Sequence, residues 1–375
     1  MRITEHPIQP GTLTGMRRLE GGNKGRLFVL ENQQSEKLVV KFQRESPAEA
    51  VAGTAIVRQV GASAPGVRVA TTAEVQVLGK ALEPLTGAIN GLVAEFRSCV
   101  AEVGQTDPKK LRYALFMEFA EGITIKDLRD DDPEAFLKAI CDPAFQFDLG
   151  RIAAADTFAG NPDRMFARRT PEGAEGWYHE KNLFLSLQDG HRAVAIDNAF
   201  APHLSRFQRL PHGLRVEGTG VQFGSISSAN QSLSETEAGH LFDTFLDTTE
   251  HAHPDMKGRI AEIRAKDRGS FIANFTRGTA TAMQTLLTRG QGWKNTLSTF
   301  MADEEMLKQF RLRKRVLRQV ATGVDPTEAR TRAASDENYR KWVLTTELKM
   351  SEQNASELLV KGVQEYKKAK QAVRI

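Results

Sequence analysis

The chain has 375 residues, of which 40% are hydrophobic and 26% charged, and its formal net charge is +4. This composition predicts a folded chain with a sizeable core in two or three structural units, and it excludes a disordered chain, a collagen or a disulfide-stapled miniprotein. No run approaches eighteen consecutive apolar residues, so no membrane-spanning helix is expected. Cys99 and Cys141 are the only cysteines, which indicates a reducing, cytoplasmic compartment.

The charge is unevenly distributed along the chain. Residues 255–375 carry 24 Lys and Arg against 14 Asp and Glu, a local +10, whereas residues 1–254 carry 27 against 33, a local −6. The densest basic run, 311–318, is interpreted either as the solvated face of a helix or as a docking site for an acidic protein or an anionic lipid. Aromatic residues are not interleaved with it, which argues against nucleic acid as a partner.

The first hundred residues are predicted to be β-rich. The apolar runs 26–30 and 37–42 flank a polar turn and predict a hairpin, and residues 67–80 are interpreted as further strands. Ser46-Pro47-Ala48-Glu49 is typical of a helix start, in which Ser46 caps, Pro47 fills the first position and Glu49 returns a hydrogen bond. This helix is expected to end near Gly61, and a second is expected over 88–101.

The next part of the chain is predicted to begin with a strand and to continue as helices. Residues 111–119 form the strand candidate and end in a turn at 120–122, while 168–180 are read as a loop and 210–235 as irregular. The later elements are expected to be helices at 124–130, 133–140 and 144–156, strands at 182–187 and 193–196, and helices from 235 onward. The expected fold class is therefore α+β and bilobal, with a ligand between the lobes.

Lys41 is the first residue that suggests chemistry, because it lies within the apolar strand LVVKF and burial of an unpaired charge is unfavourable. It either reaches into a cleft to hold phosphate oxygens, oriented by Glu49, or faces solvent from a half-exposed strand. Glu45 is a competing partner for Lys41, and helix capping is a competing role for Glu49.

Glycines precede the hairpin at Gly21, Gly22 and Gly25, and they permit close approach of the backbone to a phosphate. Their spacing is neither that of a P-loop nor the regular GxGxxG pattern. An ordinary turn between strands explains them equally well.

The middle of the chain holds the most specific pattern. The segment DTFAGNPDR, 156–164, contains Asp163 and Arg164, while Asn182 opens one apolar strand and Asp197 ends the next. The last two side chains are expected to converge, and their oxygens suit Mg²⁺, which also recruits substrate phosphates. Asp163 is a candidate acceptor for the proton of an attacking hydroxyl. The alternative is that each aspartate caps a helix or turn.

This order of lysine, glutamate, aspartate, asparagine and aspartate resembles that of the protein-kinase-like superfamily. No HRD, DFG or APE triplet is present. GNPDR and AIDNAFAPH instead resemble the atypical branch that contains actin–fragmin kinase and the type II phosphatidylinositol 4-kinases, over about residues 20–205. The resemblance implies a small β-rich N-lobe at 1–117, the core of a helical C-lobe at 118–254, and at 255–375 a basic helical segment that is either the C-terminal part of the C-lobe or an extension.

Carried over to this sequence, the resemblance implies that Lys41 holds the α- and β-phosphates of ATP and that Glu49 orients it. Asp163 would be the catalytic aspartate with Arg164 in support, and Asn182 and Asp197 would bind Mg²⁺. Because Asn182 lies 19 residues after Asp163, residues 165–181 would be an insertion. The resemblance also implies that the glycines contact phosphate. It further implies that the segment connecting the lobes contacts adenine through Glu118, Phe119 and Ala120.

The function expected from these residues is transfer of the γ-phosphate of ATP to a protein serine or threonine. Three alternatives remain: a phosphoinositide kinase that acts on an anionic lipid headgroup, a pseudokinase that only binds, and an enzyme that transfers AMP. Because regulatory segments of eukaryotic kinases are lacking, delivery of a bacterial protein into a host cytosol is a further hypothesis.

Overall fold

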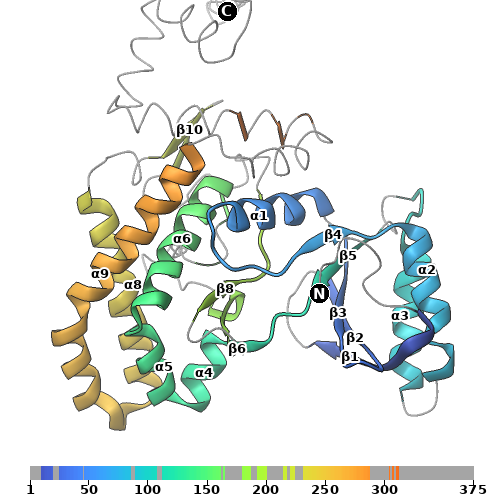
Figure 1. The fold of residues 1–375 in the computed structure, drawn as a ribbon, viewed down its shortest axis with the longest axis horizontal. Coiled ribbons are helices and arrows are strands. Elements are labelled where there is room, and N and C mark those ends of the chain that lie inside the picture. The colour runs from blue at the N-terminus through green and yellow to red at the C-terminus, as the bar shows by residue number, and fades with distance from the viewer. Residues whose placement is uncertain are drawn as a thin grey trace, which may run out of the picture.

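The computed structural model describes residues 10–19, 25–44, 46–85, 89–107, 112–161, 164, 180–186, 192–200, 214–217, 220–223, 231–287, 304, 306–307 and 310–311, and all statements below concern these residues. The chain is a mixed α+β protein of antiparallel sheets and helices, which confirms the predicted class at that level (Figure 1). The division at residues 117 and 254 stays a prediction.

A five-stranded antiparallel sheet forms the N-terminal part. The pairing of β2 with β3 confirms the predicted hairpin, with Glu31 opposite Lys37 beside the turn. One further strand, β1, pairs with β2 and was not predicted. In spatial order the strands are β1 (Leu13–Leu19), β2 (Gly25–Asn32), β3 (Lys37–Gln43), β5 (Tyr113–Glu118) and β4 (Val67–Val69).

Two helices, α2 (Thr72–Ala81) and α3 (Asn90–Glu102), cover one face of this sheet (Figure 1). Phe28, Phe42 and Phe96 meet edge to face between them, with ring centres 5.1 to 5.9 Å apart. The helix predicted at 88–101 is confirmed by α3, but the prediction of strands over 67–80 is wrong after Val69. There Thr71 and Glu74 form a capping box that starts α2, a signal stronger than the β-branched residues that suggested strands.

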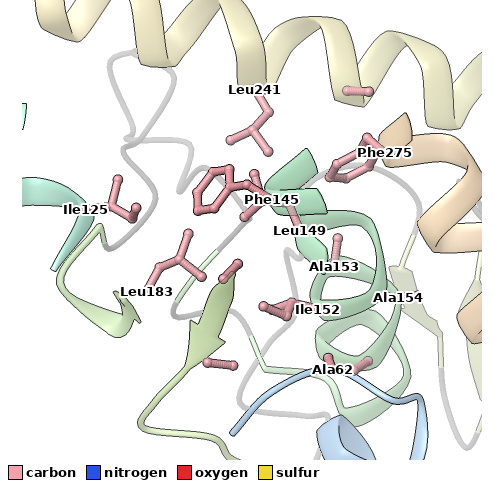
Figure 2. Packing of buried hydrophobic residues seen from close by; sticks show 14 of the residues in the cluster. Ala62, Ile125, Phe145, Leu149, Ile152, Ala153, Ala154, Leu183, Leu241 and Phe275 are labelled. Carbon is pink, nitrogen blue, oxygen red and sulfur yellow. The ribbon is translucent and has the colours of Figure 1, made fainter. Parts of the chain in front are cut away.

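The second hydrophobic core gathers around α6 (Pro143–Ala159). Side chains from α4, β7, α8 and α9 surround it in Figure 2, where Ile125, Leu183, Leu241 and Phe275 are labelled. The other elements of this part are α1 (Pro47–Gln59), β6 (Gly122–Thr124), α4 (Ile125–Asp131), α5 (Pro133–Ile140), β7 (Leu183–Ser186), β8 (Ala193–Ala195), α8 (Gln231–Ala252) and α9 (Lys257–Leu287).

Helices α6 and α9 cross at two glycines. A Cβ on Gly150 would lie 2.0 Å from the carbonyl oxygen of Phe275, and a Cβ on Gly278 would lie 2.0 Å from that of Phe147. Because no real side chain tolerates such distances, only glycine allows the two backbones to approach this closely. The crossing fixes α9 against the helix that leads into the GNPDR segment.

Most predicted elements after residue 120 are confirmed. Asp132 and Asp142 cap α5 and α6, and β7 pairs antiparallel with β8, Leu183 opposite Ala195. The turn predicted at 120–122 instead contributes Gly122 to β6. The irregular structure predicted over 210–235 is also wrong, since it contains β9 (Leu214–Glu217), β10 (Gly220–Phe223) and the start of α8. The 3₁₀ helices are η1 (Pro10–Thr12), η2 (Glu83–Leu85), η3 (Glu180–Asn182) and η5 (Pro254–Met256).

None of the helices in the described ranges combines the length and the apolar character needed to cross a membrane. The loop predicted at 168–180 and the basic run 311–318 lie outside the described residues, except for Glu180 and Arg311.

Candidate functional site

Strand β3 presents Lys41 on the face of the sheet away from α2 and α3. Leu38, Val40 and Phe42 face the core formed with those helices, and because side chains alternate along a strand, Lys41 faces the opposite way. Its Nζ lies 2.6 Å from Oδ1 of Asp197, 156 residues further along the chain. The side chain of Lys41 is 15% exposed and that of Asp197 is 52% exposed.

Apolar side chains surround Lys41 on this face. Val29, Val39 and Leu115 are buried, yet they belong to neither of the two hydrophobic cores. The strand register places Val39 between Val29 and Met117, and Leu115 opposite Lys41. The lysine therefore lies among buried apolar side chains on the face of the sheet that α2 and α3 leave free.

Asp197 follows β8 and adopts a φ of 51°, in the left-handed region that Asp and Asn occupy more readily than most residues. Asn182 lies beside it, because its carbonyl oxygen accepts a hydrogen bond from the backbone of Ile196 at 3.1 Å. The backbone of Asn182 thus lies next to the end of β8, whereas the convergence of the Asn182 and Asp197 side chains stays a prediction.

The buried guanidinium group of Arg164 forms hydrogen bonds with several segments of this region. Its side chain is 1% exposed, and its Nε and Nη2 donate to both carboxylate oxygens of Asp156 at 2.9 and 2.8 Å. Its Nη1 donates to the carbonyl oxygens of Asn182 and Ile196, and its Nη2 also donates to Oδ1 of Asn198 at 2.6 Å. One guanidinium thus joins the end of α6 to the start of β7 and the end of β8.

Asp163, the expected catalytic aspartate, lies outside the described residues. Its described neighbours on both sides are anchored to the same carboxylate, since Asn161 Nδ2 donates to Asp156 Oδ1 at 3.2 Å and Arg164 binds both oxygens. The role of Asp163 stays a prediction.

Helix α1 lies against the segment that follows Asp197. The backbone N–H of Phe200 donates to the carbonyl oxygen of Glu49 at 2.9 Å, and Nδ2 of Asn198 donates to Oγ1 of Thr54 at 3.3 Å. The structure places the carboxylate of Asp197 against Lys41, and the orientation of Lys41 by Glu49 stays a prediction. The predicted capping by Ser46 is wrong, since its side chain makes no cap hydrogen bond and Pro47 alone marks the helix start.

Gly53 allows this close approach of α1. A Cβ at this position would lie 2.5 Å from the backbone N and C atoms of Ala199. We expect Gly53→Ala to lower the free energy of unfolding by about 1–3 kcal/mol, as overpacking does. Urea unfolding measures this loss.

The matched control for Gly53→Ala is Gly269→Ala, inside α9, where an added Cβ meets no atom within 4 Å. There alanine should stabilise the helix by about 0.5–1 kcal/mol. If the two variants changed stability in the same direction, the contact between α1 and Ala199 would not be tight in solution.

The connection between β5 and β6 contains the residues predicted to contact adenine. Glu118 ends β5, and its Oε2 accepts a hydrogen bond from the backbone of Gly66 at 2.6 Å. The ring of Phe119 lies beneath two cations, Lys37 at 5.1 Å and Arg17 at 5.5 Å from its centre. Ala120 follows without regular secondary structure, and the adenine contact stays a prediction for all three residues.

The glycines are only partly described. Gly21 and Gly22 lie outside the described residues, whereas Gly25 is the first residue of β2 and pairs with Gln43. Gly25 therefore belongs to a strand, directly after the segment predicted to approach phosphate.

No group of three or more His, Cys, Asp or Glu with metal-ligand geometry occurs among the described residues. A cavity of about 690 Å³ lies elsewhere, between α5 and α9, and is lined mainly by charged side chains such as Glu134, Lys138 and Arg259. Burial raises the pKa of the Cys141 thiol at its wall to about 11. This cavity brings together none of the predicted site residues.

The roles of Gly53 and Asn198 and the partner of Asp156 were not predicted from the sequence. Asp156 and Asn198 are the side chains that hold Arg164, and both lay inside motifs that had been quoted for other residues. The signal that could have found Asp156 is its place on the apolar helix α6, where a carboxylate requires a buried cation.

Comparison with known proteins leaves the site to be interpreted on its own geometry. No family model matches the chain, and the search of curated proteins finds no match.

Proposed function

We propose that this chain is an ATP- and Mg²⁺-dependent phosphotransferase with a bilobal, atypical-kinase-like fold, which transfers the γ-phosphate of ATP to a hydroxyl of a protein substrate. The observation that carries the proposal is the 2.6 Å contact between Lys41 and Asp197, next to Asn182. The side chain of Lys41 thus meets that of Asp197 beside an apolar sheet face, and Asn182 lies next to Asp197. Both residues carry oxygen ligands and are 141 or more positions away from Lys41 in the sequence.

Lys41 would bind the α- and β-phosphates, since an ammonium with little solvent exposure strengthens its attraction to phosphate oxygens. The surface around Val29 and Val39 would receive the adenine ring, and the backbone of Glu118 to Ala120 would contact its edge. The support for this arrangement is that these apolar residues lie on the same sheet face as Lys41 and belong to neither core.

The residues present fit a magnesium ion. The carboxylate of Asp197 is half exposed, and Asn182 lies next to it, whereas Mg²⁺ needs only one or two protein carboxylates in addition to phosphate oxygens and water. When bound, the ion would supply positive charge that neutralises the phosphates. Arg164 would hold both ligand residues in place through the carbonyl oxygens of Asn182 and Ile196.

In the transfer step, the oxygen of the substrate hydroxyl would bond to the γ-phosphorus while the bond from that phosphorus to the β,γ-bridging oxygen breaks. ADP leaves with the electron pair of the broken bond, and the hydroxyl proton passes to Asp163. Catalysis would rest on alignment and charge stabilisation, which are the main contributions in phosphoryl transfer.

The test incubates the protein with ATP labelled on either the α- or the γ-phosphate, in the presence of a protein lysate and of phosphoinositide vesicles. We expect Mg²⁺-dependent γ-label in protein. Label only in lipid would favour a phosphoinositide kinase, and α-label in protein would favour AMP transfer. Absence of all label, together with no Mg²⁺-dependent shift of Tm by ATP, would overturn the proposal.

A further inference from the structure

The side chain of Asn198, the residue after Asp197, connects three parts of the fold. Its Oδ1 accepts a hydrogen bond from Nη2 of Arg164 at 2.6 Å. Its Nδ2 donates to the carbonyl oxygen of Ala195 at 3.2 Å and to Oγ1 of Thr54, on α1, at 3.3 Å. Both protons of Nδ2 thus have an acceptor, and Asn198 and Thr54 are both buried. A buried amide with these three partners is held in one orientation.

Helix α1 also contacts the two residues that follow Asn198. A Cβ on Gly53 would lie 2.5 Å from the backbone N and C atoms of Ala199. The backbone N–H of Phe200 donates to the carbonyl oxygen of Glu49 at 2.9 Å. Because Glu49 and Gly53 are four residues apart, they lie on the same face of α1. Three consecutive residues of the segment are therefore bound to this helix.

Asp197 itself lies between fixed neighbours, while its side chain points outward. The backbone N–H of Ile196 donates to the carbonyl oxygen of Asn182, and the carbonyl oxygen of Ile196 accepts from Arg164. Asp197 has a φ of 51°, a conformation that persists where the surrounding structure fixes it. Its carboxylate is half exposed and contacts Lys41. The direction of this carboxylate therefore depends on how firmly the residues on either side are held.

We propose that Asn198 and Thr54 are positioning residues, which hold the backbone of Asp197 so that its carboxylate is directed at the metal. This inference rests on the proposed function, in which Asp197 binds Mg²⁺. Because Mg²⁺ demands near-ideal octahedral geometry, a displaced carboxylate binds it less well. Residues that orient a metal ligand typically change metal affinity or activity by 10- to 100-fold when they are replaced. The metal affinity of the site would thus be set in part by α1.

Mn²⁺ binding, followed by electron paramagnetic resonance in the presence of a non-hydrolysable ATP analogue, tests this role without turnover. Thr54→Val removes the acceptor of the Asn198 amide and keeps the branched shape of the side chain. We expect it to weaken Mn²⁺ binding by about tenfold. Thr54→Ser keeps the hydroxyl and should restore the binding. The affinity for the analogue without metal should be the same in all three proteins.

A double-variant comparison assigns the effect to the pair. Asn198→Ala should weaken Mn²⁺ binding at least as much as Thr54→Val does, and Thr54→Val should cause no further loss in the Asn198→Ala protein. The matched control is Thr249→Val on α8, where a buried threonine donates to the carbonyl oxygen of Phe245 at 2.7 Å. This variant also loses a buried hydroxyl, but it should bind Mn²⁺ as the wild type does.

The positioning role is overturned if Thr54→Val binds Mn²⁺ as tightly as the wild type, or if Thr54→Ser or Thr249→Val weakens binding as much. A wild-type protein that binds neither the analogue nor Mn²⁺ would overturn both this role and the proposed function. Mn²⁺ binding that depends on Thr54, in a protein that transfers no phosphate, would support the positioning role and overturn only the phosphotransferase.

Discussion

Arg164→Met is expected to lower the free energy of unfolding by about 3–5 kcal/mol, the range measured when one partner of a buried ion pair is removed. Asp156 would then retain a charge at 1% exposure, with the Nδ2 of Asn161 as a remaining hydrogen-bond donor. The carbonyl oxygens of Asn182 and Ile196 would also lose the donor that joins them. Urea unfolding followed by circular dichroism measures the change.

Two comparisons make this prediction specific. The double variant Arg164→Met/Asp156→Leu should recover part of the loss, because it removes the orphaned charge as well. Arg259→Met, which breaks an exposed pair with Glu262 on α9, should change stability by no more than about 0.5 kcal/mol. An Arg164→Met protein as stable as Arg259→Met would mean that the buried pair does not hold the site together.

Elements with local signals could be predicted from the sequence. Helices α5 and α6 begin where an aspartate precedes a proline, and the hairpin of β2 and β3 follows from two apolar runs around a polar turn. Helix α2 was mistaken for strands because its valines suggested β-structure, although the capping pair Thr71 and Glu74 was present in the same segment. A capping box depends on two particular side chains that contact each other, so the overall composition of the segment does not reveal it.

The candidate site was predictable where strand pairing determined it. The backbone contact of Asn182 with Ile196, the residue before Asp197, follows from the antiparallel pairing of β7 with β8, which the sequence indicated. The partner of Lys41 was not predictable in this way, because proximity in sequence favoured Glu49 whereas the fold supplies a carboxylate 156 residues away. The contacts of Arg164 were equally hidden, since two of its acceptors are backbone carbonyl groups, which every residue carries.

The position of α1 shows a further limit of sequence reasoning. Its buried side chains, such as Ala52 and Ile56, pack into the core around α6 and not into the core of the five-stranded sheet that precedes it in sequence. This placement depends on Gly53, where the backbone of Ala199 occupies the space of a side chain. A glycine inside a helix gives no indication of which distant segment it approaches. The helix expected to orient Lys41 is therefore fixed to the loop that carries Asp197.

Lys41→Met and Asp197→Asn are each expected to lower kcat/KM for phosphoryl transfer by at least about 100-fold, because each removes a charge that acts directly on the phosphates or their metal. Neither should change the free energy of unfolding by more than about 1 kcal/mol, since the Asp197 side chain is 52% exposed and solvent screens the pair. The double variant should be little worse than either single variant, because the effects of residues that act as a unit are not additive.

The exposed pair Lys126 and Asp130 on α4 provides the control. The variants Lys126→Met and Asp130→Asn should keep full activity. Since the Arg164 variant is expected to lose stability while these lose only activity, the two sets separate the scaffold of the site from its chemistry. Active Lys41→Met or Asp197→Asn protein would remove both residues from the phosphotransferase mechanism.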